Sequence, residues 1–205
     1  MKLYGFGGTR SQRALWGLKE VDADFEYISV NLLEGEHKRP EFLKINPAGK
    51  VPVLIDGDRV IPESAAIVLY LVDKYPEKAL LPADLGERAQ AYRWMLFAVT
   101  ELEQPLWRIT RHTMLYPPDK RLPADIALAR EDFVAMAAIL DKHLDKRTFI
   151  VGERLTVADC VTVYLIDWAN EFHLIDGFPR LQAYLERLYA RPEAPQRIAE
   201  ARKAA

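Results

Sequence analysis

The sequence contains the stretch Asn46-Pro-Ala-Gly-Lys-Val-Pro-Val-Leu-Ile-Asp-Gly-Asp58, followed by Pro62-Glu-Ser-Ala-Ala-Ile-Val-Leu-Tyr70. Its apolar run 51–55 predicts a short strand, in which Pro52 has no N–H to donate to a neighbouring strand. We therefore expect the backbone of Val51 to stay available for a partner outside the sheet. Glu63 and Ser64 begin an apolar-periodic helix, where unpaired amides and the helix dipole favour a carboxylate or phosphate. A free strand edge, a helix N-terminus and an acidic side chain together predict a site for a small zwitterionic peptide.

The residues around this stretch alternate between strand and helix signals. Strands are expected over 2–6, 25–30, 51–55 and 59–61, helices over 11–21 and 64–74, and a short helix or turn over 40–45. Asp56-Gly57-Asp58 is a hairpin signal between the last two strands. This order predicts a small α/β layer domain over 1–77.

Beyond Pro82 the pattern becomes helical, with expected helices over 85–112, 124–144, 157–172 and 179–189. Thr156-Val157-Ala158-Asp159 has the spacing of a capping box, which stabilises a helix start. The proline-containing stretch 78–86 is the expected linker. The sequence therefore predicts an α/β domain followed by an all-α domain over 87–205.

Composition excludes several classes of function. The net charge of −2 and the pI near 6.1 give no electrostatic footprint for nucleic acid or for an anionic membrane. No apolar run approaches the ~20 residues of a membrane helix, and there is no signal-peptide pattern. The one cysteine, Cys160, excludes an internal disulfide or a Cys-x-x-Cys motif, and the histidines lack paired metal-ligand spacing. We expect a cytoplasmic protein without a metal.

Three motifs in order, Asn46 to Leu54, Pro62 to Ile67 and Leu155 to Asp159, resemble the soluble (cytosolic) glutathione S-transferase family. The resemblance is to bacterial-type members and is closest to the serine-type (theta/zeta-like) classes. It implies a thioredoxin-like N-terminal domain, a helical C-terminal domain, a homodimer and a cis bond before Pro52. It also implies that glutathione is the co-substrate and that the enzyme stabilises its thiolate for attack on a small electrophile.

The resemblance also implies roles for individual residues in holding glutathione. Val51, beside Pro52, would pair its backbone with the cysteinyl part, while Glu63 and Ser64 would hold the two charged ends of the γ-glutamyl part. Lys50 and His37 lie where the family often contacts the glycyl carboxylate, and Arg10 is a further binding candidate. The alternatives are that Glu63 and Ser64 only begin a helix and that Lys50 and His37 are solvated.

The loop Gly7-Gly8-Thr9-Arg10-Ser11 is the candidate for thiol activation, because hydrogen-bond donors, cations and helix N-termini lower a thiol pKa. Thr9 aligns best with the catalytic serine of the serine-type classes, and Ser11 is the second candidate. Arg10 takes the position of the cysteine in the cysteine-type class, which disfavours disulfide exchange. Tyr4 is a weaker candidate. The alternatives are a helix-capping Ser11, a turn residue at Thr9 and a packing role for Tyr4.

The electrophile is expected to meet Trp107, Arg108, Arg111 and His112, between the N-terminal loop and the first long helix of the second domain. An aromatic and cationic face suits a planar or anionic substrate. The same face is equally consistent with a dimer surface or an exposed helix end. Two other functions stay open: glutathione-dependent isomerisation or peroxide reduction at the same site, and a non-catalytic binding or regulatory protein that keeps the fold.

Overall fold

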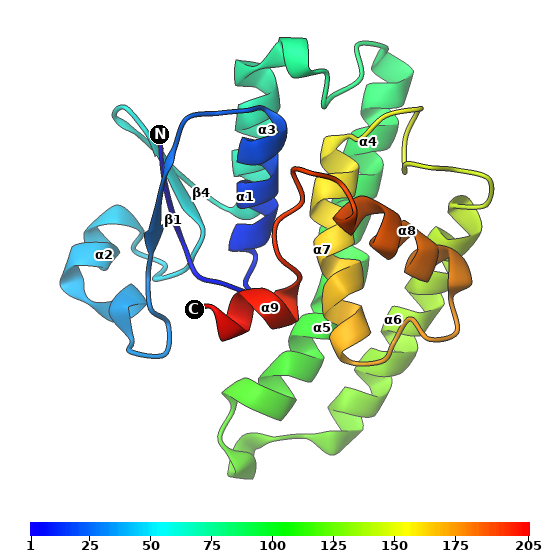
Figure 1. The fold of residues 1–205 in the computed structure, drawn as a ribbon. Helices are drawn as coiled ribbons and strands as arrows, with labels where there is room; N and C mark the ends of the chain where they lie inside the picture. Colours follow the sequence, from blue (N-terminus) through cyan, green and yellow to red (C-terminus); the bar gives the residue numbers. More distant parts are fainter. The chain divides into compact units, whose positions relative to one another are not determined.

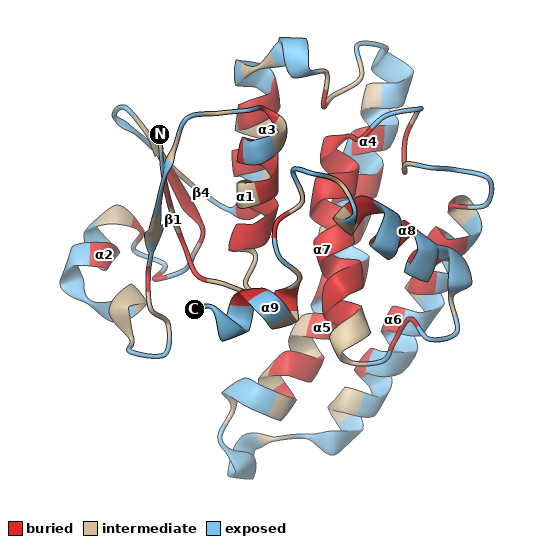
Figure 2. Cartoon of the chain, in the orientation of Figure 1, coloured by how far each residue is buried: buried red, intermediate tan, exposed pale blue.

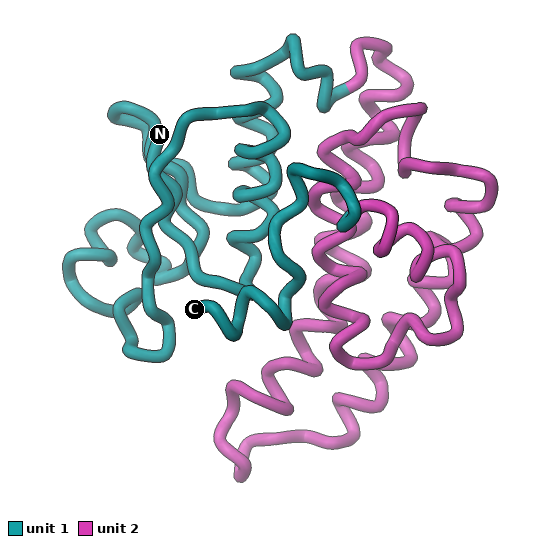
Figure 3. The backbone as a smooth tube through the Cα atoms, in the orientation of Figure 1, with its two compact units in different colours: residues 1–81, 189–205 teal, residues 82–188 magenta.

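The computed structural model describes residues 1–205, and its chain divides into two compact units (Figure 3). Unit 1 contains Met1–Leu81 together with Tyr189–Ala205, and unit 2 contains Pro82–Leu188. The sequence placed residues 189–205 in the helical domain, whereas the structure groups them with the α/β unit. The reason is that their side chains pack against the first helix of unit 1, as the ring contact between Trp16 and Tyr189 shows.

Unit 1 is built on a four-stranded sheet with the order β2-β1-β3-β4 (Figure 1). β1 (Lys2–Gly5) pairs in parallel with β2 (Glu26–Ser29) and antiparallel with β3 (Val53–Asp56), which forms a hairpin with β4 (Arg59–Pro62). The central strands β1 and β3 contribute Leu3, Val53 and Leu54, none of which is exposed. The predicted strand 51–55 begins two residues too early, because Pro52 cannot join the ladder and pairing starts at Val53.

Helices cover both faces of this sheet (Figure 1). On one face α1 (Ser11–Glu20) packs against α3 (Ser64–Lys74), and their apolar stripes are buried. On the other face lies α2 (Pro40–Ile45), preceded by the short turn η1 (Glu36–Lys38). Phe42 of α2 forms a core cluster with Val30 and Val53.

Unit 2 is all-helical. Its main helices are α4 (Leu85–Phe97), α5 (Glu103–Thr110), α6 (Pro123–His143), α7 (Val157–Glu171) and α8 (Pro179–Tyr189), the last of which ends at the unit boundary. The expected α/β-then-helical organisation is thus confirmed. None of the helices in either unit is long and apolar enough to span a membrane.

The predicted helix 85–112 is continuous but contains two wider turns, η3 (Ala98–Leu102) and η4 (Arg111–Leu115), which are π-helical. Pro105 explains the first. A proline has no N–H for the carbonyl one turn earlier and its ring clashes there, so the backbone widens before it. The Gln104 side chain donates to the carbonyl of Val99 over 3.2 Å, which satisfies one of the displaced acceptors.

α7 is the central helix of unit 2, and nearly all of its residues are buried (Figure 2). The predicted capping box is present at its start, where Thr156 and Asp159 satisfy each other's backbone N–H groups. Asp159 also accepts hydrogen bonds from the backbone of Ile150 and from the hydroxyl of Tyr184. The box therefore ties a preceding loop and α8 to the start of α7, in addition to capping the helix.

Candidate functional site

The backbone before β3 forms an open edge. Val51 makes no hydrogen bond within the chain, and the bond between Val51 and Pro52 is cis, as the resemblance implied. Asn46 holds the preceding loop, because its side-chain amide donates to the carbonyl of Lys50 over 2.8 Å and its oxygen accepts from the amide of Ala48 over 3.1 Å. The N–H and C=O of Val51 are therefore presented by a fixed loop and are available to a peptide.

The start of α3 lies in the same unit and presents complementary groups. Glu63 is exposed, has no side-chain partner and adopts a left-handed backbone with φ 72°. Non-glycine residues in such conformations cost energy and cluster at functional sites. Ser64 is only 5% exposed, and its hydroxyl accepts a hydrogen bond from Arg13 over 3.3 Å. The first amides of α3 have no intrahelical acceptor and are available for a carboxylate.

Arg13 was not predicted as a site residue. It is buried in α1 and donates a hydrogen bond from its guanidinium to Ser64, so it helps to position the start of α3. The available signal was an arginine beside the apolar stripe of a helix, since a buried cation requires a partner. The sequence alone could not tell which element would supply that partner.

The turn at Gly49 lies against the segment that contains His37 and Lys38. A Cβ at this glycine would lie 2.9 Å from the carbonyl oxygen of His37 and 3.0 Å from Nζ of Lys38. Burial, with a smaller contribution from Lys38, lowers the pKa of His37, whose buried Nδ1 has no hydrogen-bond partner. Lys50 follows Gly49 and is exposed. The backbone of His37 thus lies beside Gly49, the neighbour of Lys50, and Lys38 joins them as a residue that was not predicted from the sequence.

The loop between β1 and α1 contains two coupled hydroxyl groups. Thr9 Oγ1 lies 2.6 Å from the carbonyl oxygen of Phe6 and 2.9 Å from Ser11 Oγ. A carbonyl can only accept, so the Thr9 proton goes to Phe6 and the Ser11 proton goes to Thr9. Ser11 Oγ in turn accepts from the amide of Phe6 over 3.2 Å. Ser11 is 1% exposed, whereas Thr9 is half-buried, so Thr9 is the hydroxyl that a ligand can reach.

The other two candidates in this region have different surroundings. Arg10 is the N-cap residue of α1, so Ser11 is the first helical residue and not the cap. Tyr4 packs its ring 6.4 Å from that of Phe42, in the core between the sheet and α2. The packing alternative for Tyr4 is therefore the one that the structure supports.

Two of the four residues expected to meet the electrophile form an ion-pair network inside unit 2. Arg108 Nε lies 3.1 Å from Asp125, and another guanidinium nitrogen lies 2.6 Å from Asp132. His112 is buried, with Nε2 3.2 Å from Asp125 and Nδ1 accepting from the amide of Leu122. The Arg108 guanidinium holds the pKa of Asp125 below its usual value. These contacts tie α5 and its π turn to α6.

The remaining two residues contact aromatic rings. The Trp107 ring lies 6.3 Å from that of Trp168 on α7, and the Arg111 guanidinium lies 6.0 Å from the Tyr116 ring. Arg111 Nε is buried and has no hydrogen-bond partner. The aromatic and cationic character predicted from the sequence is therefore present, although Arg108 and His112 are already paired.

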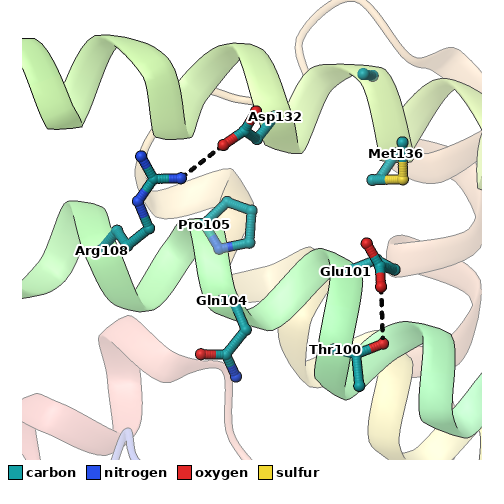
Figure 4. Close-up of a pocket in the computed structure, with 8 residues that line it drawn as sticks. Thr100, Glu101, Gln104, Pro105, Arg108, Asp132 and Met136 are labelled. Carbon is teal, nitrogen blue, oxygen red and sulfur yellow. Dashed lines mark hydrogen bonds and ion pairs between the residues drawn. The ribbon is translucent and has the colours of Figure 1, made fainter.

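Unit 2 also has an open cavity of about 270 Å³ between the η3–α5 region and α6 (Figure 4). It is lined by Thr100, Glu101, Gln104, Pro105, Arg108, Asp132, Ala135 and Met136. Of the residues predicted for the second substrate only Arg108 lines it, and that side chain points to Asp132 across the cavity end. The cavity therefore shares only Arg108 with the predicted face.

Comparisons with known proteins agree with the geometry of unit 1. A family model described as "Glutathione S-transferase, N-terminal domain" matches residues 1–73, and its C-terminal counterpart matches residues 111–192. Glutathione S-transferase F10 of Arabidopsis thaliana is 33% identical over 190 residues, which cover 88% of each chain. The zeta-class glutathione S-transferase of Euphorbia esula is 37% identical over 163 residues, or 78% of this chain and 71% of that protein.

A solved structure extends the likeness to the whole fold. The glutathione transferase URE2P6 of Phanerochaete chrysosporium, in complex with oxidized glutathione, superposes with a TM-score of 0.87 at 28% identity. That likeness covers 100% of this chain and 97% of the other. These relatives are from plants and a fungus, so they do not support the bacterial-type part of the expected resemblance. The name of the Euphorbia protein agrees with the zeta-like part.

Proposed function

The chain belongs to the glutathione S-transferase family of enzymes, and on that premise we propose that unit 1 binds glutathione and stabilises its thiolate for attack on a small electrophile. The observation that carries the proposal is the unpaired backbone of Val51 in the same unit as the free carboxylate of Glu63 and the open start of α3. An extended peptide with a positive and a negative end needs these three kinds of group. The similar structure of URE2P6 holds oxidized glutathione.

In this proposal glutathione is held along its whole length. Glu63 pairs with the γ-glutamyl ammonium group, and Ser64 with the first α3 amides receives the γ-glutamyl carboxylate. Val51, fixed beside Pro52, pairs with the backbone of the cysteinyl residue. Lys38 and Lys50 supply positive charge for the glycyl carboxylate, and His37 offers a ring nitrogen to it. The unpaired Nδ1 of His37 supports this assignment, because a buried ring nitrogen without a partner is uncommon.

Thr9 is the proposed donor to the thiolate, with Ser11 as its support. The Thr9 proton, which now goes to the carbonyl of Phe6, rotates toward the sulfur when the thiol loses its proton to solvent. Ser11 keeps donating to the Thr9 oxygen, and such chained donors polarise one another. The positive end of the α1 dipole and the Arg10 cation favour the same negative charge. The thiolate then attacks the electrophile, and its leaving group departs.

Titration of the bound thiol tests this assignment. Ultraviolet absorbance of the thiolate in the wild type is expected to give a thiol pKa well below the value of about 8.5 for a free cysteine. Thr9→Val, which removes the hydroxyl at nearly constant volume, is expected to raise that pKa by about one unit, and Thr9→Ser to keep it low. Thr100→Val in unit 2 is the matched control. An unshifted thiol pKa in the wild type would leave only a binding role.

We further propose that the protein is a homodimer and that Trp107 and Arg111 contact the electrophile. The exposed apolar side chains on α4 and α6, among them Leu96, Leu128 and Ile139, support a covered surface on unit 2. Sedimentation velocity measures the assembly, and a monomer at micromolar concentration would refute it. Arg108 and His112 are assigned to the ion-pair network with Asp125 and not to direct substrate contact.

A further inference from the structure

The C-terminal segment, defined as Tyr189–Ala205, packs along one face of α1. Trp16 is fully buried, and its ring lies 5.1 Å from the ring of Tyr189. One turn further, the Glu20 carboxylate receives two hydrogen bonds from Arg191, over 3.0 and 2.8 Å, and a third from Trp16 Nε1 over 2.9 Å. The Glu20 side chain is only 6% exposed. The far half of α1 is therefore held by the C-terminal segment and not only by the sheet.

The same face of α1 continues to its first turn. Gln12, four residues before Trp16, is buried and donates from Nε2 to the carbonyl oxygen of Gln196 over 2.9 Å. Directly after this contact the segment forms α9 (Ile198–Lys203), which lies beside the start of α1 (Figure 1). Gln12 is the neighbour of Ser11, so the C-terminal segment is fixed within one residue of the coupled hydroxyls.

α9 also closes over the glycine turn that leads into the hydroxyl pair. A Cβ at Gly7 would overlap the carbonyl oxygen of Ala201, and a Cβ at Gly8 would overlap the Arg202 side chain and approach the carbonyl oxygen of Ile198. Only glycine lets the turn approach the helix backbone this closely. The loop is thus held between β1 on one side and α9 on the other.

We propose that the C-terminal segment positions the thiol-activating loop, with Gln12 and Gly7 as its positioning residues; this inference rests on the proposed function. The Thr9 hydroxyl needs a fixed direction, because it must exchange its bond to Phe6 for a bond to the thiolate. A hydrogen bond weakens steeply when its angle is lost, so a small displacement of the turn raises the thiol pKa. Glutathione remains bound, because Val51 and Glu63 lie on other segments.

Two full-length variants test the inference without altering either hydroxyl. Gln12→Ala removes the bond to Gln196, and Gly7→Ala places a methyl group against the backbone of α9. Each is expected to raise the thiol pKa of bound glutathione by about one unit. At pH values below that pKa, the fraction of glutathione present as thiolate then falls roughly tenfold. The kcat is expected to fall by the same factor at low pH and to recover at high pH, while the glutathione Kd changes less than about twofold.

Matched controls separate this effect from a general loss of stability. Gln182→Ala removes the same kind of bond, from a side-chain amide to a carbonyl, at an exposed position in unit 2. Gly177→Ala adds a methyl group where nothing lies within 4 Å. Both are expected to leave the thiol pKa unchanged. If the wild type lowers the thiol pKa and both test variants retain that value, the segment is only structural and the inference is wrong. If the wild type itself does not lower the thiol pKa of bound glutathione, the proposed function is wrong, and the inference that rests on it is wrong as well.

Discussion

Replacement of Asp159 by alanine tests how far one buried carboxylate supports the helical unit. Asp159 is 0% exposed, and each of its oxygens accepts two hydrogen bonds. Oδ1 receives the amide of Ile150 and the hydroxyl of Tyr184, both over 2.9 Å. Oδ2 receives the amide of Thr156 over 2.8 Å and its hydroxyl over 3.0 Å. The carboxylate therefore joins the capping box to a loop and to α8.

The expected loss of unfolding free energy follows from the buried donors that Asp159→Ala would leave without an acceptor. The amides of Ile150 and Thr156 and the hydroxyl of Tyr184 would each lose a buried acceptor, at a cost of about 1–3 kcal/mol per group. Part of this cost is offset, because burial raises the pKa of Asp159 and so makes the ionised carboxylate itself unfavourable. Entry of water into the small cavity offsets a further part. We expect a net loss of about 4 kcal/mol, which is a large share of a typical unfolding free energy of about 5–15 kcal/mol.

Urea unfolding followed by tryptophan fluorescence measures this loss. Asp159→Asn keeps the volume and one acceptor oxygen, so it is expected to lose about half as much free energy as Asp159→Ala. Asp73→Ala, at an exposed position on α3, is the control and is expected to change stability by less than about 0.5 kcal/mol. A loss below about 1 kcal/mol in Asp159→Ala would refute the view that the network is a principal support of unit 2.

Three other variants probe separate parts of the chain. Glu63→Gln is expected to weaken glutathione binding about tenfold in calorimetric titration, because the ion pair with the ammonium group becomes a hydrogen bond to a neutral amide; an unchanged Kd would contradict the binding assignment. Burial lowers the pKa of His143, so the folded state binds fewer protons than the unfolded state between that lowered pKa and about 6.5. The unfolding free energy should therefore fall as the pH drops through this window, and His143→Gln should reduce that slope. Arg191→Leu leaves the Glu20 carboxylate without its cationic partner and is expected to cost about 2 kcal/mol in urea unfolding, with retention of full stability as the contrary result.

Local signals explain why much of unit 1 was predictable. Helix α3 (Ser64–Lys74) follows a hairpin turn and ends before Pro76, so it was predicted with the bounds observed. Helix α2 (Pro40–Ile45) begins at a proline, and the sequence predicted a short helix or turn over the same residues. The capping-box pattern that begins at Thr156 indicates a helix start, and α7 begins there. Each of these features depends on residues a few positions apart, and the sequence displays such spacings directly.

Features that depend on distant residues could not be obtained in the same way. α9 is short, and its position is set by contacts with Gly7 and Gly8 at the other end of the chain. The bond from Arg13 to Ser64 likewise joins two helices that lie about 50 residues apart in the sequence. The π turn before Pro105 is an intermediate case. A proline inside a predicted helix indicates a distortion, but it does not indicate that the side chain of Gln104 would donate to the carbonyl of Val99.

The choice between Thr9 and Ser11 shows what coordinates add to a motif. The loop sequence offers two hydroxyls, and either one could activate a thiol. Their hydrogen-bond directions are not equivalent, because the carbonyl of Phe6 takes the Thr9 proton and thereby makes Ser11 the donor to Thr9. A buried Ser11 that already donates to its neighbour cannot also reach a ligand, whereas a half-buried Thr9 exchanges one acceptor for another by rotating its O–H bond. Loss of Ser11 should therefore weaken the Thr9 donor without removing it, so Ser11→Ala should raise the thiol pKa by less than Thr9→Val does.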